Sequence, residues 1–360
     1  MKSHKFIISG GGTGGHIYPA LAIATGIKAN YKNPKILFVG ARGKMEMHKI
    51  PEQGYPIVGL WISGIKRSLS FSNLLFPFKL FISLIHSSLI IRKFKPDLII
   101  GTGGFASGPL LQVALWLNYP TLIQEQNSYP GITNRILGKN VDRICVAFDS
   151  MEKFFPQSKI RVTGNPIRDY IVKTKSNKIS KKFFDLDIDK KTLIIIGGSL
   201  GSERINKLIK SELEYIKSFG LQIIWQCGSF YYEKLKSLSS KKVIIKPFIN
   251  HIGHFYSAAD YIISRAGAGS ISELSCVAKP SLLIPSPNVS ENHQLHNARV
   301  LAKKKAILLI QEKDLDKKFK AIFSQLVVDK KIQKEMKKNL KSFAFPDATK
   351  NIIKEIKDIL

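Results

Sequence analysis

Two glycine-rich turns, about half a chain apart, constrain the fold of this sequence more than any other feature. Each follows a short run of β-branched and apolar residues, at 6–8 and 193–196, and each precedes a stretch with helical periodicity. The turns read Gly10-Gly11-Gly12-Thr13-Gly14-Gly15-His16 and Gly197-Gly198-Ser199-Leu200-Gly201. Such a turn presents backbone N–H groups at the positive end of a helix, where phosphate or diphosphate binds well. The duplication predicts two Rossmann-like domains that share one nucleotide-containing ligand.

The length of the chain supports this division. A prior of roughly 150 residues per domain gives two domains for a chain of 360 residues. With 44% hydrophobic residues the chain has enough apolar material for packed cores. Residues 1–5 lead directly into an apolar run, so we expect no signal peptide. The cysteines lack metal-ligand spacing and are expected to be buried thiols in a reducing cytoplasm: Cys145, Cys227 and Cys276.

The formal net charge of +30 raises the question of a nucleic-acid partner. The excess comes almost entirely from lysines, many of them toward the C-terminus at 303–305, 317–318, 330–331 and 337–338. No recognition helix, zinc-finger pattern or aromatic RNA-stacking motif accompanies them, so we expect no nucleic-acid partner. Two interpretations stay open. The lysines form solvated helix faces, or they draw the protein to anionic lipid head groups.

Apolar runs alternate with helical patterns from end to end, which predicts parallel sheets built from βαβ units. We expect domains at residues 1–166 and 167–345, with a terminal helix at 346–360 for which a return to the first domain is one option. Residues 173–191 are rich in lysine and serine and are interpreted as a linker. Strands are predicted at 5–10, 35–40, 56–60, 97–101, 120–125, 142–148, 159–163, 192–197, 221–226, 243–247, 260–264, 281–285 and 306–310. Helices are predicted at 16–30, 43–53, 71–94, 107–118, 131–139, 314–329, 331–343 and 347–359, with others between the later strands.

Residues 71–94 depart from the pattern because apolar side chains cover nearly every helical face. A membrane span needs about 20 apolar residues. Pro77, Lys79, His86 and four serines interrupt this segment, so no span is expected. A buried helix is one interpretation. The other is a helix that dips one face into the membrane interface, with positive charge around it from Lys66, Arg67, Lys79, Arg92, Lys93 and Lys95.

The first glycine turn fits the pattern G-x-G-x-x-G, which alone suggests NAD or FAD. The acidic residue expected after the second strand is missing, and Arg42 stands there instead, which disfavours a dinucleotide oxidoreductase. Further motifs follow other predicted strands, at 101–109 (GTGGFASGP), 124–127 (QEQN), 264–273 (SRAGAGSISE) and 292–298 (NHQLHNA). Because ligands of open α/β sheets bind at the carboxyl ends of the strands, we expect the motifs of both halves to converge on one cleft.

In this order, GGGTGGH, GTGGFASGP, EQN, GNPIR, GGSLGS, RAGAGSISE and NHQ…NA resemble the motifs of the MurG family of peptidoglycan glycosyltransferases over nearly the whole chain. The resemblance implies an α/β chain with the GT-B fold, in which two Rossmann-like parallel-sheet domains face a central cleft. It implies inverting transfer of GlcNAc from UDP-GlcNAc to the C4 hydroxyl of the MurNAc of lipid I, which gives lipid II. It also implies peripheral attachment to the cytoplasmic face of the bacterial plasma (inner) membrane, through its anionic surface. Other cell-wall synthesis proteins are further candidate partners.

Two positions depart from the family pattern. Gln124 stands where a histidine commonly precedes EQN, and Gly269 stands where the family has a bulkier residue. The second departure affects the loop on the uridine side of the donor.

Carried over residue by residue, the resemblance assigns most of the candidate site to the donor UDP-GlcNAc. Thr13, Gly14 and Gly15 would flank it, and Asn127 would bind the GlcNAc hydroxyls. Arg168, in GNPIR, and Ser199 would meet the diphosphate. Ile249 would present its backbone to uracil, with Ala268, Gly269 and Ser270 in the loop beside the uridine. Glu273, expected on the first turn of its helix, would hold the ribose hydroxyls, and Gln294 the sugar, with its neighbour His293 as the alternative.

Displacement at the anomeric carbon needs a base for the incoming hydroxyl and groups that stabilise the negative charge of the departing UDP. Backbone N–H groups, Ser199 and Arg168 would stabilise that charge. We expect neither a metal nor a cofactor, because no Asp-x-Asp motif stands at a predicted strand end and Asp185-Leu186-Asp187 falls in the predicted linker. His16 is the first candidate base, since a helix N-terminus favours neutral imidazole, and helix capping is its alternative role. Glu125 is the reserve base or a brace for the glycine loops, and Glu46 is a weaker surface option.

Ser107 and Ser202 are interpreted as helix N-caps. Other functions remain open beside the transferase. Another GT-B enzyme that glycosylates a lipid is disfavoured by GTGGFASGP and EQN. A non-catalytic nucleotide-sugar-binding scaffold is disfavoured by the intact His16, Glu125, Arg168 and Glu273.

Overall fold

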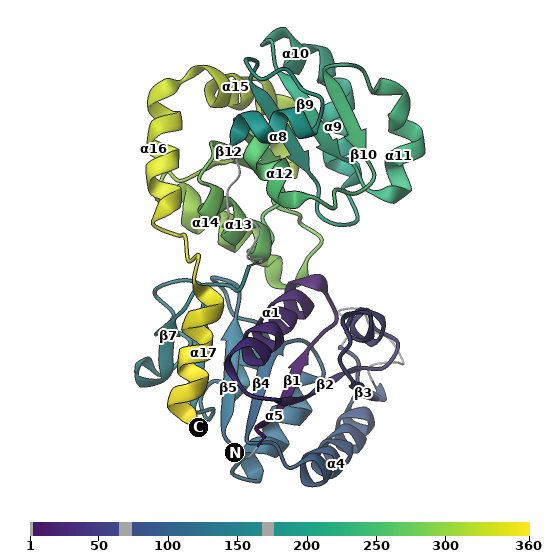
Figure 1. The fold of residues 1–360 in the computed structure, drawn as a ribbon, viewed down its shortest axis with the longest axis vertical. Coiled ribbons are helices and arrows are strands. Elements are labelled where there is room, and N and C mark those ends of the chain that lie inside the picture. The colour runs from purple at the N-terminus through teal and green to yellow at the C-terminus, as the bar shows by residue number, and fades with distance from the viewer. Residues whose placement is uncertain (1–2, 65–73, 168–175) are drawn as a thin grey trace. The chain divides into compact units, whose positions relative to one another are not determined.

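The computed structural model of the chain describes residues 3–64, 74–167 and 176–360, and these form two compact units (Figure 1). The first unit comprises Met1–Ile167 and Asp347–Leu360, and the second comprises Arg168–Pro346. Each unit contains one parallel sheet covered by helices, which is the architecture that alternating strand and helix patterns predict.

The first unit has a seven-stranded sheet in the order β3-β2-β1-β4-β5-β6-β7. Its strands are β1 (Lys5–Gly10), β2 (Lys35–Ala41), β3 (Ile57–Leu60), β4 (Leu98–Gly103), β5 (Thr121–Glu125), β6 (Arg143–Val146) and β7 (Ile160–Val162). Its helices are α1 (Gly14–Asn30), α2 (Glu46–Lys49), α4 (Phe76–Phe94), α5 (Ser107–Trp116), α6 (Ile132–Leu137) and α17 (Ala348–Ile359). Side chains alternate along β1, so Ile7 joins the core under α4 and α5, while Phe6 and Ile8 join the core under α1 and α17.

The second unit repeats this plan with six strands in the order β10-β9-β8-β11-β12-β13. They are β8 (Thr192–Ile196), β9 (Gln222–Gln226), β10 (Val243–Lys246), β11 (Tyr261–Ser264), β12 (Ser281–Leu283) and β13 (Leu308–Leu309). The helices are α8 (Asn177–Phe183), α9 (Glu203–Ser211), α10 (Leu213–Ser218), α11 (Ser229–Leu235), α12 (Ile252–Ala258), α13 (Ala268–Val277), α14 (His293–Lys303), α15 (Leu315–Val328) and α16 (Lys330–Lys341). Trp225, fully buried, is the largest side chain of this core.

All thirteen predicted strands are confirmed, with ends that differ by two residues or fewer. In both sheets the strand order reverses beside the first strand of the unit, β1 or β8, which places the glycine turns at a topological switch point. The helix predicted at 43–53 is wrong in its continuity. It is α2 followed by a separate 3₁₀ turn, Pro51–Gln53, because Pro51 has no N–H to continue the α-helical ladder.

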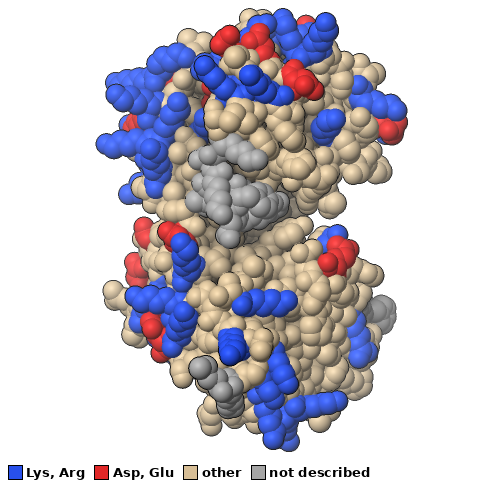
Figure 2. Space-filling model, viewed as in Figure 1, with Lys and Arg blue, Asp and Glu red and all other residues tan. Residues whose placement is uncertain are grey.

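Lysine side chains dominate part of the surface of the second unit, over α16 (Figure 2). The exposed lysines of this helix are Lys330, Lys331, Lys334, Lys337, Lys338 and Lys341. The inner face of α16 carries Met336 and Leu340, both buried. The helix is therefore amphipathic, and its lysines lie on the solvent side.

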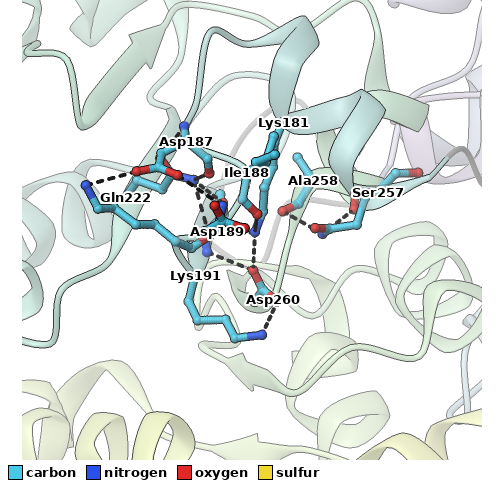
Figure 3. A network of polar contacts seen from close by, with 12 residues as sticks. Lys181, Asp187, Ile188, Asp189, Lys191, Gln222, Ser257, Ala258 and Asp260 are labelled. Atoms are coloured by element: carbon cyan, nitrogen blue, oxygen red, sulfur yellow. Dashed lines mark hydrogen bonds and ion pairs between the residues drawn. The ribbon is translucent and has the colours of Figure 1, made fainter.

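The segment predicted as a linker is not one from residue 177 onward. Helix α8 packs on α12, and Lys181 lies within 3.1 Å of Asp260 although it is only 3% exposed (Figure 3). Asp187, in the Asp-x-Asp pattern expected to be merely solvated, uses its backbone N–H and carbonyl to bond the Gln222 side chain. The composition predicted a linker because lysine-rich segments are usually exposed to solvent. Here Lys181 is buried and forms an ion pair with Asp260.

Helix α17 packs against α1 within the first unit. Gly26 in α1 allows the approach, since a Cβ there would lie 2.7 Å from Thr349 Cγ2 and 3.0 Å from Ile353 Cγ1. The apolar face of α17 is buried at Ile352, Ile353 and Ile356. The last helix thus belongs to the same core as the first.

Candidate active site

The first glycine turn lies between β1 and α1 and packs against the glycines that follow β4. Gly11 N–H donates to Gly103 O at 3.2 Å, and Gly104 has φ of 96°. A Cβ on Gly104 would lie 2.4 Å from Gly11 O. Glycine is required there for both conformation and space. The turn therefore brings Thr13, Gly14 and Gly15 to the carboxyl edge of the sheet.

Glu46 supports this turn from beneath, and the prediction of a surface residue is wrong. It is 1% exposed and accepts hydrogen bonds from Gly12 N–H at 2.8 Å and from Ala41 N–H at 3.0 Å. Gly12 lies in the glycine turn and Ala41 ends β2, both beyond the last residues at which β1 pairs with β2, so a buried carboxylate is a suitable acceptor for their N–H groups. Glu46 fixes the shape of the turn rather than facing a ligand.

His16 lies at the start of α1 and is half-buried. Its Nδ1 is 2.9 Å from Thr102 O and 3.0 Å from Gln126 Oε1. Thr102 Oγ1 also donates to the backbone carbonyl of His16 at 2.8 Å. Among the described residues no hydrogen bond engages Nε2, so this nitrogen is the one left for a ligand.

Glu125 ends β5 and is 1% exposed. Its Oε1 accepts from the backbone and side chain of Asn127, at 2.9 and 3.2 Å. Its Oε2 accepts from Gly131 N–H at 3.2 Å and from Asn134 Nδ2 at 2.8 Å. Four donors on one carboxylate favour a bracing role over that of a base. The segment braced is the one after β5, which carries Asn127, rather than the glycine loops.

Ser107 and Ser202 differ in what their hydroxyls do. Ser202 is the N-cap of α9 and accepts from Ile205 N–H, as predicted. Ser107 is not an N-cap, because α5 already begins at this residue. Its buried hydroxyl donates to Ser9 O and Gly103 O, both at 3.0 Å, and so ties β1 to β4 under the glycine turns.

The second glycine turn joins β8 to α9 and depends on two left-handed glycines, Gly198 with φ of 97° and Gly201 with φ of 79°. A Cβ on Gly201 would lie 1.9 Å from Cys227 O, so the loop after β9 closes tightly on the turn. Ser199 is exposed at the tip of the turn. Its hydroxyl and the N-terminus of α9 are suited to a diphosphate.

Gln226 connects this turn to Ile249, the residue predicted to meet uracil, and sequence reasoning missed it. Its Nε2 donates to Gly198 O at 3.0 Å, and its Oε1 accepts from Ile249 N–H at 2.9 Å. Because the Ile249 N–H is used in this way, contact with a uracil ring would fall to the carbonyl. Gln226 is the last residue of β9, and strand-end position was the only signal available for it.

The loop after β11 leads into α13, which carries Ala268, Gly269, Ser270 and Glu273. Gly267 is the N-cap, with an extended ψ of 147°, and the helix begins at Ala268. Glu273 therefore lies on the second turn, and its prediction on the first turn is wrong. The buried Tyr256 hydroxyl donates to Glu273 Oε2 at 3.0 Å, which orients the carboxylate.

Gln294, on the first turn of α14, joins two loops. Its Oε1 accepts from Ser286 N–H at 2.9 Å and from Ala266 N–H at 3.3 Å. Among the described residues its Nε2 has no hydrogen bond, so the amide nitrogen is the group left for a sugar. His293, the alternative, is the first residue of the same helix.

Arg265 holds these loops together. It belongs to the motif at 264–273, but the sequence predicted no role for it. Its guanidinium donates to Ile284 O and to the Ser202 hydroxyl, and it forms an ion pair with Glu312. A planar guanidinium with several donors suits such bridging. The arginine thus ties the β11 loop to the N-cap of α9.

The predicted site residues form two groups, one on the carboxyl edge of each sheet. The first unit brings together Thr13, Gly14, Gly15, His16, Glu125 and Asn127. The second brings together Ser199, Ile249, Ala268, Gly269, Ser270, Glu273 and Gln294. Arg168 lies outside the described residues.

Comparison with known proteins identifies the family of this chain. Residues 6–146 match the glycosyltransferase family 28 N-terminal domain, and residues 192–352 match the glycosyltransferase family 28 C-terminal domain. The chain is 51% identical over 358 residues to the UDP-N-acetylglucosamine–N-acetylmuramyl-(pentapeptide) pyrophosphoryl-undecaprenol N-acetylglucosamine transferase of Flavobacterium psychrophilum. That alignment covers 99% of this chain and 98% of the relative. A protein of the same name from Parabacteroides distasonis is 44% identical, covering 100% of this chain and 99% of the relative.

Solved structures agree with this placement. The crystal structure of Acinetobacter baumannii MurG is similar with a TM-score of 0.80 at 26% identity, covering 99% of this chain and 100% of that one. A calicheamicin glycosyltransferase, at 11% identity and a TM-score of 0.73 over 100% of this chain and 99% of that one, shows the fold alone. The fold is GT-B, with a Rossmann-like sheet in each unit. With both of its domain profiles matched and half of its residues shared with such relatives, the chain belongs to glycosyltransferase family 28.

Proposed function

We propose that this chain transfers GlcNAc from UDP-GlcNAc to the C4 hydroxyl of the MurNAc of lipid I, with inversion, to give lipid II. The observation that carries the proposal is the identity of about half of all residues, over the whole chain, with transferases named for this reaction. The two carboxyl edges supply the chemical groups that the reaction needs.

The second unit provides for the donor. The turn 198–201 and the N-terminus of α9 would receive the diphosphate, with Ser199 and Arg168 adding donors. The Ile249 carbonyl would accept from uracil, and Glu273 would hold the ribose hydroxyls. Gln294 would offer its amide nitrogen to the sugar. Ser199, the Ile249 carbonyl, Glu273 and Gln294 are held by the hydrogen bonds and turns described above, so little ordering of these groups is needed on binding.

The first unit provides the base and contacts to the reacting sugar. His16 Nε2 would take the proton of the C4 hydroxyl as its oxygen bonds the anomeric carbon. The bond from that carbon to the β-phosphate oxygen breaks, and the electron pair leaves with UDP. Thr13, Gly14 and Gly15 would flank the donor, and Asn127 would bind the GlcNAc hydroxyls. Positive backbone groups at the diphosphate stabilise the departing charge.

The decisive assay incubates the purified protein with labelled UDP-GlcNAc and a lipid I analogue. We expect labelled lipid II analogue and UDP in equal amounts. Activity should survive exhaustive dialysis against EDTA, because the diphosphate charge is assigned to arginine and backbone donors. UDP-GlcNAc binding without product would favour a scaffold instead. Loss of turnover restored only by magnesium or manganese would refute the metal-free mechanism.

We further propose that α4 attaches the protein to an anionic bilayer. Its inner face is buried at Ile90 and Ile91, whereas a stripe of apolar side chains on its outer face is exposed. The helix is therefore not wholly buried. The stripe comprises Phe78, Phe81, Ile85 and Leu89, and Leu74 and Leu75, just before the helix, are exposed as well. Lys79, Arg92, Lys93 and Lys95 flank it, while Lys66 and Arg67 lie outside the described residues. Apolar insertion plus basic flanks suffices for reversible binding.

The helix is not proposed as a span. Among residues 3–64, 74–167 and 176–360, no helix is long and apolar enough to cross a membrane. Peripheral binding at the cytoplasmic face of the inner membrane would bring the enzyme to an acceptor whose lipid tail stays in the bilayer.

A further inference from the structure

A chain of buried amides lies against the Nδ1 side of His16. Gln124, Gln126 and Asn165 are 0%, 1% and 3% exposed. The two glutamines lie at and just after the end of β5, and Asn165 follows β7. A buried amide destabilises a fold unless its donors and acceptors are paired. Here the three amides satisfy one another, and the last of them meets the imidazole.

The contacts leave Gln126 a single orientation. Its Nε2 donates to Thr102 O at 2.8 Å and to Gln124 O at 2.9 Å, which puts its Oε1 3.0 Å from His16 Nδ1. Gln124 in turn donates to Asn165 Oδ1 at 2.8 Å. Asn165 Nδ2 donates back to the Gln126 carbonyl at 3.1 Å. Reversing the Gln126 amide would bring its oxygen against two carbonyl oxygens.

This arrangement decides which imidazole nitrogen carries the proton. Both neighbours of Nδ1, the Thr102 carbonyl and Gln126 Oε1, are acceptors. Nδ1 must therefore be the N–H, and neutral imidazole has only one. Nε2 is left with the lone pair that a base requires.

We propose that Gln126 is a positioning residue for glycosyl transfer, which holds the Nδ1–H of His16 with an uncharged acceptor. This rests on the role of His16 in the proposed function. A carboxylate in the same place would stabilise the imidazolium, as the aspartate of a Ser-His-Asp triad does. An amide fixes the ring equally well and places no charge beside it.

Titratable side chains on the elements around His16 include Glu46, Glu125 and Tyr18. Glu46 lies beneath the glycine turn, with its oxygens bonded to Gly12 N–H and Ala41 N–H. Glu125 lies beside Gln126 in sequence and accepts from the segment 127–134. Tyr18 follows on the exposed side of α1. None of these hydrogen-bonds the ring in the described structure, so Gln126 is the position at which charge can be introduced.

The test is an NMR titration of the full chain labelled with ¹⁵N-histidine. The chain has 8 histidines, and His16→Gln assigns the resonance. We expect the wild type to show the Nδ1–H form. In Gln126→Glu, the pH at which His16 takes up a proton should rise by about one unit or more. The acid limb of kcat/KM should move by the same amount. Gln222→Glu is the matched control, since Gln222 is 2% exposed in the second unit and its described partners are Asp187, Lys190 and Thr192, none of them a histidine.

Either of two NMR results would overturn the proposal: an Nε2–H form in the wild type, or an unchanged His16 titration in folded Gln126→Glu. Should that variant not fold, Asn165→Ala tests the same chain of amides. It should lower kcat about tenfold or more while KM for UDP-GlcNAc is unchanged, because ring alignment and not donor binding is lost. An unchanged kcat refutes the proposal. Full turnover in His16→Gln refutes the assignment of the base itself, and the NMR result separates that failure from a wrong tautomer.

Discussion

Gly269 is the second residue of α13, and a Cβ added there would meet nothing within 4 Å. Its helical conformation is open to any residue, so Gly269→Ala should raise stability by up to about 1 kcal/mol through helix propensity. Thermal unfolding measures the gain. A lower melting temperature would mean that the site has less room than the geometry indicates. UDP titration of the same variant tests the loop beside the proposed uridine position.

Glu273 gives the sharper test of the donor site. Glu273→Ala should weaken UDP binding by about 1–3 kcal/mol, the value of hydrogen bonds to a charged group. It also leaves the buried Tyr256 hydroxyl without its carboxylate acceptor. Tyr256→Phe is therefore the control, because it removes that bond and keeps the carboxylate. Calorimetric titration with UDP should separate the two variants, and equal affinities for UDP would remove Glu273 from the site.

At the scale of elements, the attachment of α8 to the second sheet depends on Asp260. Burial opposes ionisation of this carboxyl. Hydrogen bonds from Thr192 N–H and Lys181, with the charge of Lys181, outweigh burial and hold the pKa of Asp260 below its usual value. A carboxyl whose pKa is lower in the folded state stabilises the fold above its unfolded pKa of about 3.9. That contribution is lost as the pH falls through the lower folded value.

Asp260→Asn should cost about 3 kcal/mol near neutral pH, because it leaves Lys181 buried without a counter-charge. The loss should become smaller as the pH falls through the folded-state pKa of Asp260, because the wild-type carboxyl then also becomes protonated. Urea unfolding at several pH values measures both. Asp187→Asn is the control, since Asp187 and its partner Lys190 are exposed, and little change is expected. An equal loss for Asp260→Asn at all pH values would contradict the linkage.

The strands were predictable because parallel sheets bury both faces, so their sequences are short apolar runs, several of them ended by glycine or proline. The candidate residues at their carboxyl ends followed from topology. The buried roles of Glu46 and Lys181 were not predictable, because burial of a charge depends on partners distant in sequence, such as Gly12 and Asp260. Gln126 was visible as part of a motif, but its contact with His16 depends on how the ends of β4 and β5 approach α1, which the sequence does not reveal.

For the whole molecule, the α4 stripe predicts salt-sensitive binding to anionic vesicles. Phe78 and Phe81, 55% and 61% exposed, should insert, while the basic residues attract the leaflet over about 8–10 Å at physiological ionic strength. Replacing both with serine should reduce vesicle binding and turnover on lipid-embedded acceptor, and spare turnover on a short-chain soluble acceptor. Vesicle co-sedimentation at rising salt measures the first effect.

Phe230→Ser is the matched control, because Phe230 is 79% exposed on α11 in the second unit. It should leave vesicle binding unchanged. If the α4 variant unfolds, or loses activity on both acceptors equally, the stripe stabilises the fold and does not bind lipid. If binding persists in high salt, apolar insertion dominates over charge.

The return of α17 to the first unit has a consequence for synthesis on the ribosome. Helix α1 emerges early, but Ile352, Ile353 and Ile356, which cover it, are translated after the entire second unit. The second unit is continuous in sequence and can complete its core while the first still exposes an apolar helix face. Nascent chains should therefore bind chaperones through α1 until translation nears its end. A premature stop codon before residue 348 would remove a wall of the first core, and the truncated product should aggregate.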